Sequence, residues 1–233
     1  MKTPALLLAT LILALTTSKG AAQRTLAAFS VWKPKDGQAA NFEAGYKQHL
    51  KWHRSAGDLW DWYGWLIISG PRDGQFIDAT FGHAWSDLDH RVDPAGDGAD
   101  NALHTEPFAD FLSGSKWQRL PFSAAEDSTT LGARYLRMLT IDVSNAAAAI
   151  TIIQAAAAAA PRKFLAYEKL DGGALPQLLL LFPSTSFTEY GEAATWQNTL
   201  LDLDHKNPRP VITSLTAETL LFRRDLTLLT TQP

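Results

Sequence analysis

The 233-residue sequence contains no cysteine. That absence excludes disulfide bonds, thiolate metal sites, a cysteine nucleophile and a lipid-modified N-terminal cysteine. The sequence also lacks a Gly-x-Ser-x-Gly elbow, a phosphate-binding loop and a dinucleotide-binding fingerprint. Without covalent crosslinks, the folded chain has to be stabilised by its buried core, and a chain of this length can form one.

An excess of positive charge is missing as well. The chain has 21 Lys and Arg against 24 Asp and Glu, a formal net charge of −3. Its paired basic residues, Arg162-Lys163 and Arg223-Arg224, are isolated in the sequence. Nucleic acids and anionic membranes attract proteins with extended basic surfaces. We therefore expect no nucleic-acid partner, and no membrane partner for the mature chain.

Long apolar runs are scarce, and the one near the N-terminus is short. The uncharged, mostly apolar run Ala5–Thr17 follows Lys2, and Gly20-Ala21-Ala22 comes after it. A membrane-spanning helix needs about 20 apolar residues, whereas a run of this kind followed by small residues is typical of a signal peptide. The pattern predicts a cleaved signal peptide over residues 1–22. Because secreted eukaryotic proteins more often contain disulfides, we expect a secreted or periplasmic bacterial protein.

The rest of the sequence gives the same order of elements twice. Within residues 23–123, apolar periodicity and turn residues predict helices at 39–54 and 97–112, and strands at 26–32, 60–69, 76–85 and 116–122. Within residues 134–233 they predict helices at 144–160 and 187–203, and strands at 135–143, 163–170, 175–182 and 210–229. The small, polar stretch 124–133 has the composition of a linker.

Each half therefore has the order βαββαβ, which is that of a ferredoxin-like unit. A sheet covered by helices on one face leaves its other face bare, and two such units can bury these faces against each other. The sequence predicts an α+β fold in which two ferredoxin-like repeats pack as an intrachain α+β barrel. The alternative is two independent α+β domains.

One segment of the first half resembles a known family. Trp62–Arg91 contains Gly70-Pro71 at a predicted turn and then His83-Ala84-Trp85. It resembles the NIPSNAP-type branch of the dimeric α+β barrel superfamily, in which a strand carries a His-x-Trp pair followed by a Leu and a basic residue. In the second half, Phe182–Ser186 stands where such a pair would be, which indicates a single site.

The resemblance supports the barrel fold and leaves the chemistry open. The superfamily contains cofactor-free monooxygenases, haem-degrading enzymes, dye-decolourising peroxidases and proteins without known activity. A shared fold does not determine function, so the activity has to be argued from individual residues.

Aromatic residues and histidines gather in the first half. Seven of the eight Trp and five of the six His precede residue 118. His83 and Trp85 alternate on one face of a predicted apolar strand, where a histidine needs a hydrogen-bond partner or a cavity. We predict a ligand pocket in the first repeat, with His83 as the candidate catalytic acid, base or donor, lined by His83, Trp85, Trp62, Tyr46 and His49. The alternative is an irregular core filled by Trp, with His83 as a hydrogen-bonded core histidine.

Two histidines also have the spacing of metal ligands. His49 and His53 are four residues apart on a predicted helix and leave the same face. Between them stands Leu50-Lys51-Trp52, without the glutamate of the zinc protease motif. We predict no resident metal or cofactor. The alternatives are a metal on His49 and His53, with His83, Asp87, His90 or Glu43 as a third ligand, and haem on His83.

The segment after Trp85 is dense in carboxylates, and these are Asp87, Asp89, Asp93, Asp97 and Asp100. Their spacing does not match a calcium-binding EF-hand loop. We interpret the segment as a solvated loop with helix-capping Asp residues.

These observations favour an exported protein that binds a small apolar or aromatic molecule in a pocket of the first repeat. One alternative is a cofactor-independent monooxygenase or haem-handling enzyme. Another is a non-catalytic structural protein whose pocket is filled by its own side chains. Whether the protein is an enzyme, and its oligomeric state, are left open by the sequence.

Overall fold

The computed structural model describes residues 23–230, which form strands and helices. The strands are β1 (Leu26–Pro34), β2 (Tyr63–Ser69), β3 (Phe76–His83), β4 (Ala109–Arg119), β5 (Tyr135–Val143), β6 (Leu165–Asp171), β7 (Gln177–Ser184) and β8 (Ile212–Phe222). The helices are α1 (Ala39–Ser55), α2 (Trp85–Asp89), α3 (Pro94–His104), α4 (Ser128–Leu131), α5 (Ala146–Ala159) and α6 (Phe187–Lys206), and a 3-10 turn, η1, spans Arg224–Leu226. The predicted signal peptide lies outside the described residues.

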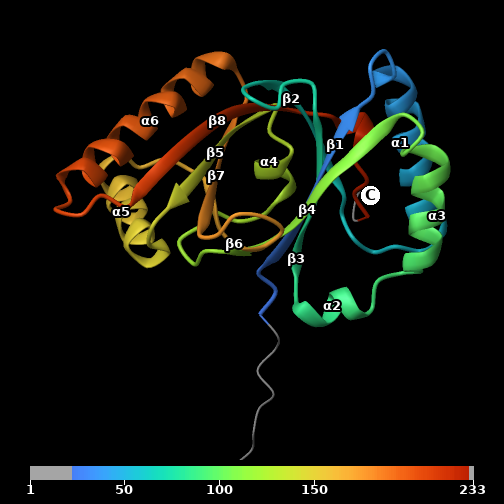
Figure 1. Ribbon diagram of the computed structural model, residues 1–233, viewed down its shortest axis with the longest axis horizontal. Coiled ribbons are helices and arrows are strands. Elements are labelled where there is room, and N and C mark those ends of the chain that lie inside the picture. Colours follow the sequence, from blue (N-terminus) through green and yellow to red (C-terminus); the bar gives the residue numbers. More distant parts are fainter. Residues whose placement is uncertain (1–22, 231–233) are drawn as a thin grey trace, which may run out of the picture.

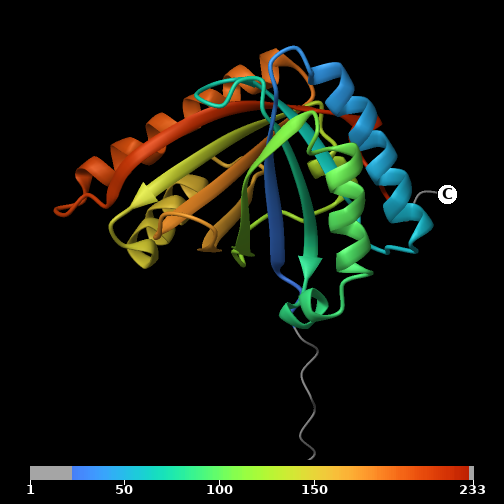
Figure 2. The same cartoon turned by 45° about the vertical axis from the view of Figure 1, so that its right-hand side comes forward.

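The strands close into one antiparallel barrel with the order β1-β3-β2-β8-β5-β7-β6-β4 (Figure 1). Helices α1 and α3 cover one side of it, and α5 and α6 cover another (Figure 2). Pairing of β2 with β8 and of β4 with β6 connects strands from the two halves of the chain. The predicted α+β barrel is confirmed, and the alternative of two independent domains is wrong. Closure is partial along two strands, because β4 pairs with β6 only over Lys116–Arg119 and β8 pairs with β2 only over Thr219–Phe222.

Side chains alternate between the inside of the barrel and the helix-covered outside, as the pleat requires. The interior core includes Phe29, Trp65 and Tyr167. A second core lies between α5, α6 and the sheet, and a third, around Trp32 and Phe42, lies beneath α1. The third core adjoins the candidate site. Within the described residues, none of the helices has the length and apolar character needed to cross a membrane.

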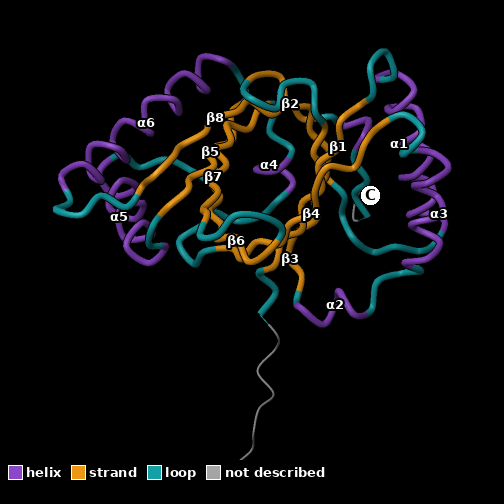
Figure 3. The backbone as a smooth tube through the Cα atoms, in the orientation of Figure 1, coloured by secondary structure: helices purple, strands orange, loops and turns teal. Residues whose placement is uncertain are grey.

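The stretch 124–133, which has the composition of a linker, packs into the barrel. Asp127 accepts a hydrogen bond from the Thr130 amide at 2.7 Å and so begins α4. Leu131 and Ala133 then join the interior core, and α4 lies within the ring of strands in Figure 3. The small polar residues here cap a short helix, and the two apolar residues that follow fill the barrel.

Several predicted element boundaries in the first half are wrong, and two of them have a local cause. The helix expected over 97–112 is α3, which ends at His104, and residues from Ala109 onward belong to β4. The Thr105 hydroxyl bonds back to the Asn101 carbonyl at 2.9 Å and Thr105 caps the helix. The strand expected to reach Trp85 ends at His83, because Gly82 adopts a φ of 71° that breaks the alternation.

Candidate metal centre

Helix α1 turns one face toward the barrel, and two histidines lie on it. The face follows the spacing of an amphipathic helix, as predicted, and contains Phe42, Tyr46, His49, Leu50 and His53. His49 is 5% exposed and His53 is 2% exposed. A buried polar group has to be hydrogen-bonded or it costs stability, so the surroundings of these rings are informative.

Each ring is fixed by a carboxylate at its Nδ1 atom. Asp100 Oδ2 lies 2.8 Å from Nδ1 of His49, and Asp58 Oδ2 lies 2.8 Å from Nδ1 of His53. An ionised carboxylate can only accept a hydrogen bond, so each Nδ1 carries a proton, and in the neutral form of each ring Nε2 has a free lone pair. Outer carboxylates orient metal-ligating histidines in this way.

The two Nε2 atoms converge on a third side chain. They are 3.1 Å apart. Asp97 Oδ1 lies 3.4 Å from Nε2 of His49 and 3.9 Å from Nε2 of His53. Two lone pairs that face each other repel, and so does the carboxylate oxygen beside them, unless a proton or a cation lies between them.

These separations match the edges of a coordination polyhedron. Metal–ligand distances of about 2.0–2.1 Å place neighbouring ligands about 3.0 Å apart in an octahedral site and about 3.4 Å apart in a tetrahedral one. The 3.1 and 3.4 Å separations lie in this range, and the 3.9 Å one needs only a small shift of the carboxylate. Two histidines and one carboxylate form a ligand set used for zinc and for non-haem iron.

Asp97 reaches the site because the acidic segment forms a helix. Asp93 accepts a hydrogen bond from the Gly96 amide at 3.0 Å, and Pro94 follows as the first helical residue. Asp97 is 8% exposed, pairs with Arg91 through Oδ2 and accepts from Asn101 at 3.0 Å through Oδ1. The interpretation of this segment as a solvated loop is therefore wrong for Asp97.

Burial and hydrogen bonds act in opposite directions on the pKa values of His49 and Asp58. It lowers the pKa of His49, although the hydrogen bond to Asp100 opposes the shift. Burial would raise the pKa of Asp58, but hydrogen bonds from His53, the Trp60 amide and Trp62 together hold it below its usual value. A neutral imidazole is the form that ligates a metal, and an ionised carboxylate is the form that accepts its Nδ1 proton.

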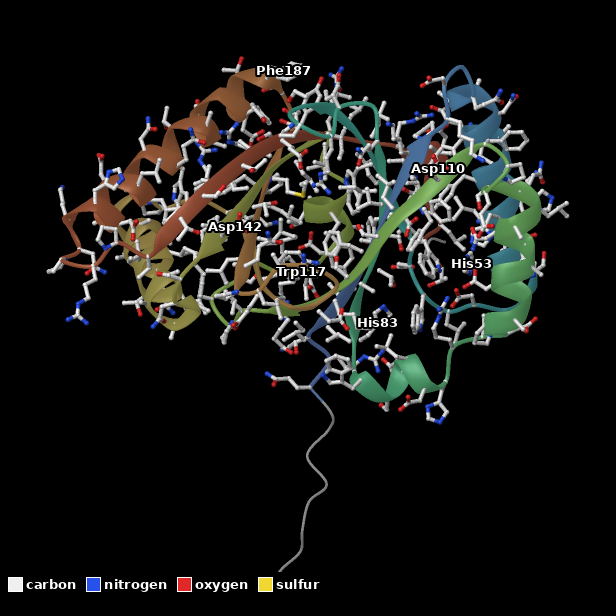
Figure 4. The ribbon with its side chains drawn as sticks, viewed as in Figure 1. His53, His83, Asp110, Trp117, Asp142 and Phe187 are labelled. Atoms are coloured by element: carbon white, nitrogen blue, oxygen red, sulfur yellow. The ribbon has the colours of Figure 1, made fainter. Side chains whose placement is uncertain are left out.

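The site opens into a cavity of about 270 Å³ that is bounded by α1, α3 and the outer face of β1 and β3. Figure 4 shows His53 in this part of the molecule, between the helices and the sheet. Trp32 donates a hydrogen bond of 2.8 Å to Asp78 in the cavity wall. Burial raises the pKa of Asp78 to about 6, and burial and Asp78 raise that of Tyr46 well above its usual value. The wall thus presents a carboxyl group that exchanges its proton near pH 6.

Three predicted pocket residues, Tyr46, His49 and Trp62, line this cavity. Trp85 does not, because it begins α2 and is 54% exposed. The expectation that His83 and Trp85 share a buried strand face is therefore wrong, since the strand ends between them.

His83 is buried in a different place. Its Nε2 lies 2.6 Å from Thr80 Oγ1, and its ring centroid is 4.0 Å from that of Trp60. Its Nδ1 lies 3.8 Å from Asp87, beyond hydrogen-bond distance. Burial lowers the pKa of His83. These contacts hold the ring against the core, and His83 does not line the cavity next to the metal-ligand cluster.

Sequence reasoning missed Asp58, Asp97 and Asp100. The pair Asp97 and Asp100 has the i, i+3 spacing of one helix face, just as His49 and His53 have the i, i+4 spacing of another. That signal was present, but only the packing of α3 against α1 shows that the two faces meet.

Solved structures with a similar fold are known, whereas family models and curated proteins give no match. No protein-family model matches this chain, and no curated protein matches it. Solved structures do match. An anthrone oxidase-like protein has 9% sequence identity and a TM-score of 0.57, over 90% of this chain and 94% of the other.

Two further solved structures show the same likeness. A candidate monooxygenase from Lactobacillus acidophilus has 9% identity and a TM-score of 0.55, over 88% of this chain and 96% of the other. A haem-binding protein from Thermus thermophilus has 6% identity and a TM-score of 0.51, over 87% and 92%. The neighbours have the dimeric α+β barrel fold. At these identities the likeness shows the fold alone.

A haem-binding neighbour makes haem worth testing against the residues present. Haem needs an axial ligand directed into a space that holds the macrocycle. The Nε2 atoms of His49 and His53 face each other, and that of His83 is held by Thr80. In residues 134–233 the single histidine, His205, is exposed in the last turn of α6. Nδ1 of His83 has no hydrogen-bond partner, but His83 does not line the cavity, so the buried histidines of the described chain do not offer it an axial haem ligand.

Proposed function

We propose that the protein binds one divalent transition-metal ion through Nε2 of His49, Nε2 of His53 and Oδ1 of Asp97. The observation that carries this proposal is the convergence of two buried Nε2 atoms, 3.1 Å apart, on a carboxylate while both Nδ1 atoms are held by other carboxylates. A hydrogen-bonded histidine pair alone requires a proton shared between two nitrogens. A divalent ion would in addition be ligated by the Asp97 oxygen, which lies beside both nitrogens and also accepts a hydrogen bond from Asn101.

Three protein ligands leave at least one coordination position for a small molecule. Catalytic zinc sites and non-haem iron sites have this composition, whereas structural zinc sites are closed by four protein ligands. The cavity of about 270 Å³ adjoins the site, and Tyr46 and Trp62 give it aromatic walls. This keeps the prediction of a small-molecule pocket in the first half and adds a metal to it. The metal would act there as a Lewis acid.

Elemental analysis tests the proposal. Protein purified without a histidine tag, and loaded with zinc before desalting, should retain about one metal ion per chain. His49→Ala, His53→Ala and Asp97→Ala should each lower the affinity by more than tenfold, since loss even of an outer partner costs about 10- to 100-fold. His205→Ala, which removes the exposed histidine of α6, is the matched control and should bind as wild type does. Equal metal content in all five proteins would contradict the proposal.

A second candidate function is oxygen chemistry in the same cavity. The specific observation is the two-histidine, one-carboxylate set, which also holds Fe(II) in oxygenases. Neighbours described as a monooxygenase candidate and as anthrone oxidase-like are compatible with it. Dioxygen consumption by iron-loaded protein, lost in Asp97→Ala, would support this candidate over a zinc site. The cofactor-independent monooxygenase expected as an alternative would keep that activity after chelation.

Two expectations about the whole chain also belong to this proposal. We infer that the two βαββαβ halves are ferredoxin-like repeats of one unit, as their matching element order supports, and we keep the NIPSNAP-type branch as a prediction.

We also infer that the protein is exported after cleavage before Gln23, on the pattern of residues 1–22. The mass of the mature protein in the medium or periplasm tests this; a full-length cytoplasmic chain would contradict it.

A further inference from the structure

The barrel interior contains a second cavity, of about 330 Å³. It is lined by residues of both halves of the chain. Helix α4 leads into the start of β5, whereas this cavity is lined along β5 from Met138 to Asp142. The barrel interior is thus filled by the core and α4 toward one end and is hollow toward the other. A cavity of this size is within the range of small-molecule pockets.

The floor of this cavity is apolar. Inward-facing side chains of four strands form it, and these are Phe29, Val31, Ile77, Met138 and Leu179. Trp117 adds an aromatic wall, and Figure 4 shows Trp117 on β4 and Asp142 on β5 as separate parts of the barrel wall. An apolar floor favours the side chain or tail of a ligand, because burying apolar surface is favourable.

The rim of this cavity is charged, and it contains one ion pair, between Arg72 and Glu218. Glu218 is 2% exposed, and Arg72 donates to both of its carboxylate oxygens, with Nε at 3.1 Å from Oε1 and 3.0 Å from Oε2. A bidentate pair of this kind satisfies both partners. Arg72 and Glu218 therefore shape the mouth and leave little unmet charge for a ligand.

A second set of rim residues carries charges that form no contact ion pair. Lys169 donates to the side-chain oxygen of Gln177 at 3.2 Å, and the side-chain nitrogen of Gln177 donates to Asp142 at 2.6 Å. Within residues 23–230, neither Lys169 nor Asp142 has an ion-pair partner within 4.0 Å. Lys169 also lies over the Trp117 ring, 5.3 Å from its centroid. The mouth therefore holds a cation and an anion that form no contact ion pair and are bridged by the amide of Gln177, while Asp142 and Asp171 act on Lys169 only at longer range.

We propose that this mouth binds an α-amino acid with an apolar side chain. Lys169 receives the carboxylate, Asp142 receives the ammonium group, and the side chain enters the apolar floor. A partly buried charge is stabilised by an opposite charge with good hydrogen-bond geometry. A ligand with only one charge would compensate only one of Lys169 and Asp142. The other charge would then lack a partner at a mouth that the bound ligand closes to water. The proposal is independent of the metal centre, which lies outside the barrel.

Calorimetry with matched ligands tests the proposal. L-leucine and L-phenylalanine should bind to the purified wild-type protein. Phenylpropanoate, which lacks the amine, and phenethylamine, which lacks the carboxylate, should each bind about 10- to 100-fold more weakly, as expected for one lost hydrogen-bonded charge. In Lys169→Gln, L-phenylalanine should no longer bind more tightly than phenethylamine, which lacks the carboxylate. In Asp142→Asn, it should no longer bind more tightly than phenylpropanoate, which lacks the amine. Lys163→Gln, which changes a lysine that does not line this cavity, is the control and should leave binding unchanged.

Several outcomes would overturn the proposal. One is the absence of amino-acid binding to wild type, another is equal affinity for L-phenylalanine and phenylpropanoate, and a third is unchanged selectivity in both variants. Near-ultraviolet circular dichroism checks that Lys169→Gln and Asp142→Asn are folded. Amino-acid binding that persists in His49→Ala would confirm that this site and the metal centre are separate.

Discussion

At the scale of single residues, the carboxylates around the metal-ligand cluster differ in their hydrogen-bond donors. Asp58 and Asp100 each accept a hydrogen bond from a histidine Nδ1. Asp78 receives a hydrogen bond from Trp32, and no cation lies within 4.0 Å of it among the described residues. Burying an ionised carboxylate without a cation is costly, and burial raises the pKa of Asp78 to about 6.

Asp78 predicts a pH dependence of stability. Burial raises its pKa from 3.8 to about 6 in the folded state. Between these values the folded state holds a proton that the unfolded state has released. The resulting stabilisation is complete below pH 3.8 and is lost as the pH rises through about 6. Its size is about 2–3 kcal/mol.

Urea unfolding of chelator-treated protein checks this prediction. Asp78→Asn replaces the carboxyl by a neutral group of the same shape and cannot titrate. Its free energy of unfolding, relative to wild type, should therefore rise by about 2–3 kcal/mol between about pH 4 and pH 7. A difference between the two proteins that stays constant with pH would show that Asp78 titrates as an ordinary carboxyl group.

At the scale of elements, the metal centre depends on how closely α1 and α3 approach. A Cβ atom added to Gly45 in α1 would lie 1.7 Å from the carbonyl oxygen of His104, at the end of α3. Glycine is therefore required where the two helices touch. The same contact brings Asp97 of α3 to the histidines of α1.

Gly45→Ala should separate α1 from α3. Alanine normally stabilises a helix relative to glycine by about 0.5–1 kcal/mol, but here overpacking should cost about 1–3 kcal/mol instead. Metal affinity should fall as well, because Asp97 moves with α3. Gly191→Ala in α6, where a Cβ atom would meet nothing within 4 Å, is the control and should stabilise the protein. Thermal unfolding and metal analysis measure both effects; similar results for the two variants would contradict the described helix contact.

At the scale of the whole molecule, one barrel is built from both halves and filled from the segment between them. Leu131 follows the polar stretch of α4 and is 1% exposed within the barrel core. The connection thus contributes to stability as a core element does. A solvated linker would not.

Leu131→Ala should lower the free energy of unfolding by about 2–5 kcal/mol, the range for a fully buried leucine. Leu103→Ala, at a leucine that is 67% exposed on α3, should change it by less than about 0.5 kcal/mol. Chemical denaturation measures both. An equally small effect at the two positions would mean that residues 124–133 do behave as a linker.

Element order could be predicted because each strand and helix has its own period of apolar residues. The run Leu26–Trp32 and the face of α1 are examples. Boundaries were less predictable where one residue decides them, as Gly82 does at the end of β3. The histidine pair of the candidate site was visible as a spacing. Its carboxylates were not, because Asp58, Asp97 and Asp100 reach it from a loop and from another helix.

The sequence by itself determined the alternation of strands and helices, the absence of thiol chemistry and the common face of His49 and His53. These properties depend on residue identity and on neighbours a few positions apart. Only the tertiary structure decided that Asp97 completes the cluster, that Trp85 is exposed and that Leu131 fills the barrel. Such outcomes depend on how helices and strands distant in sequence pack together, and no local period encodes that packing.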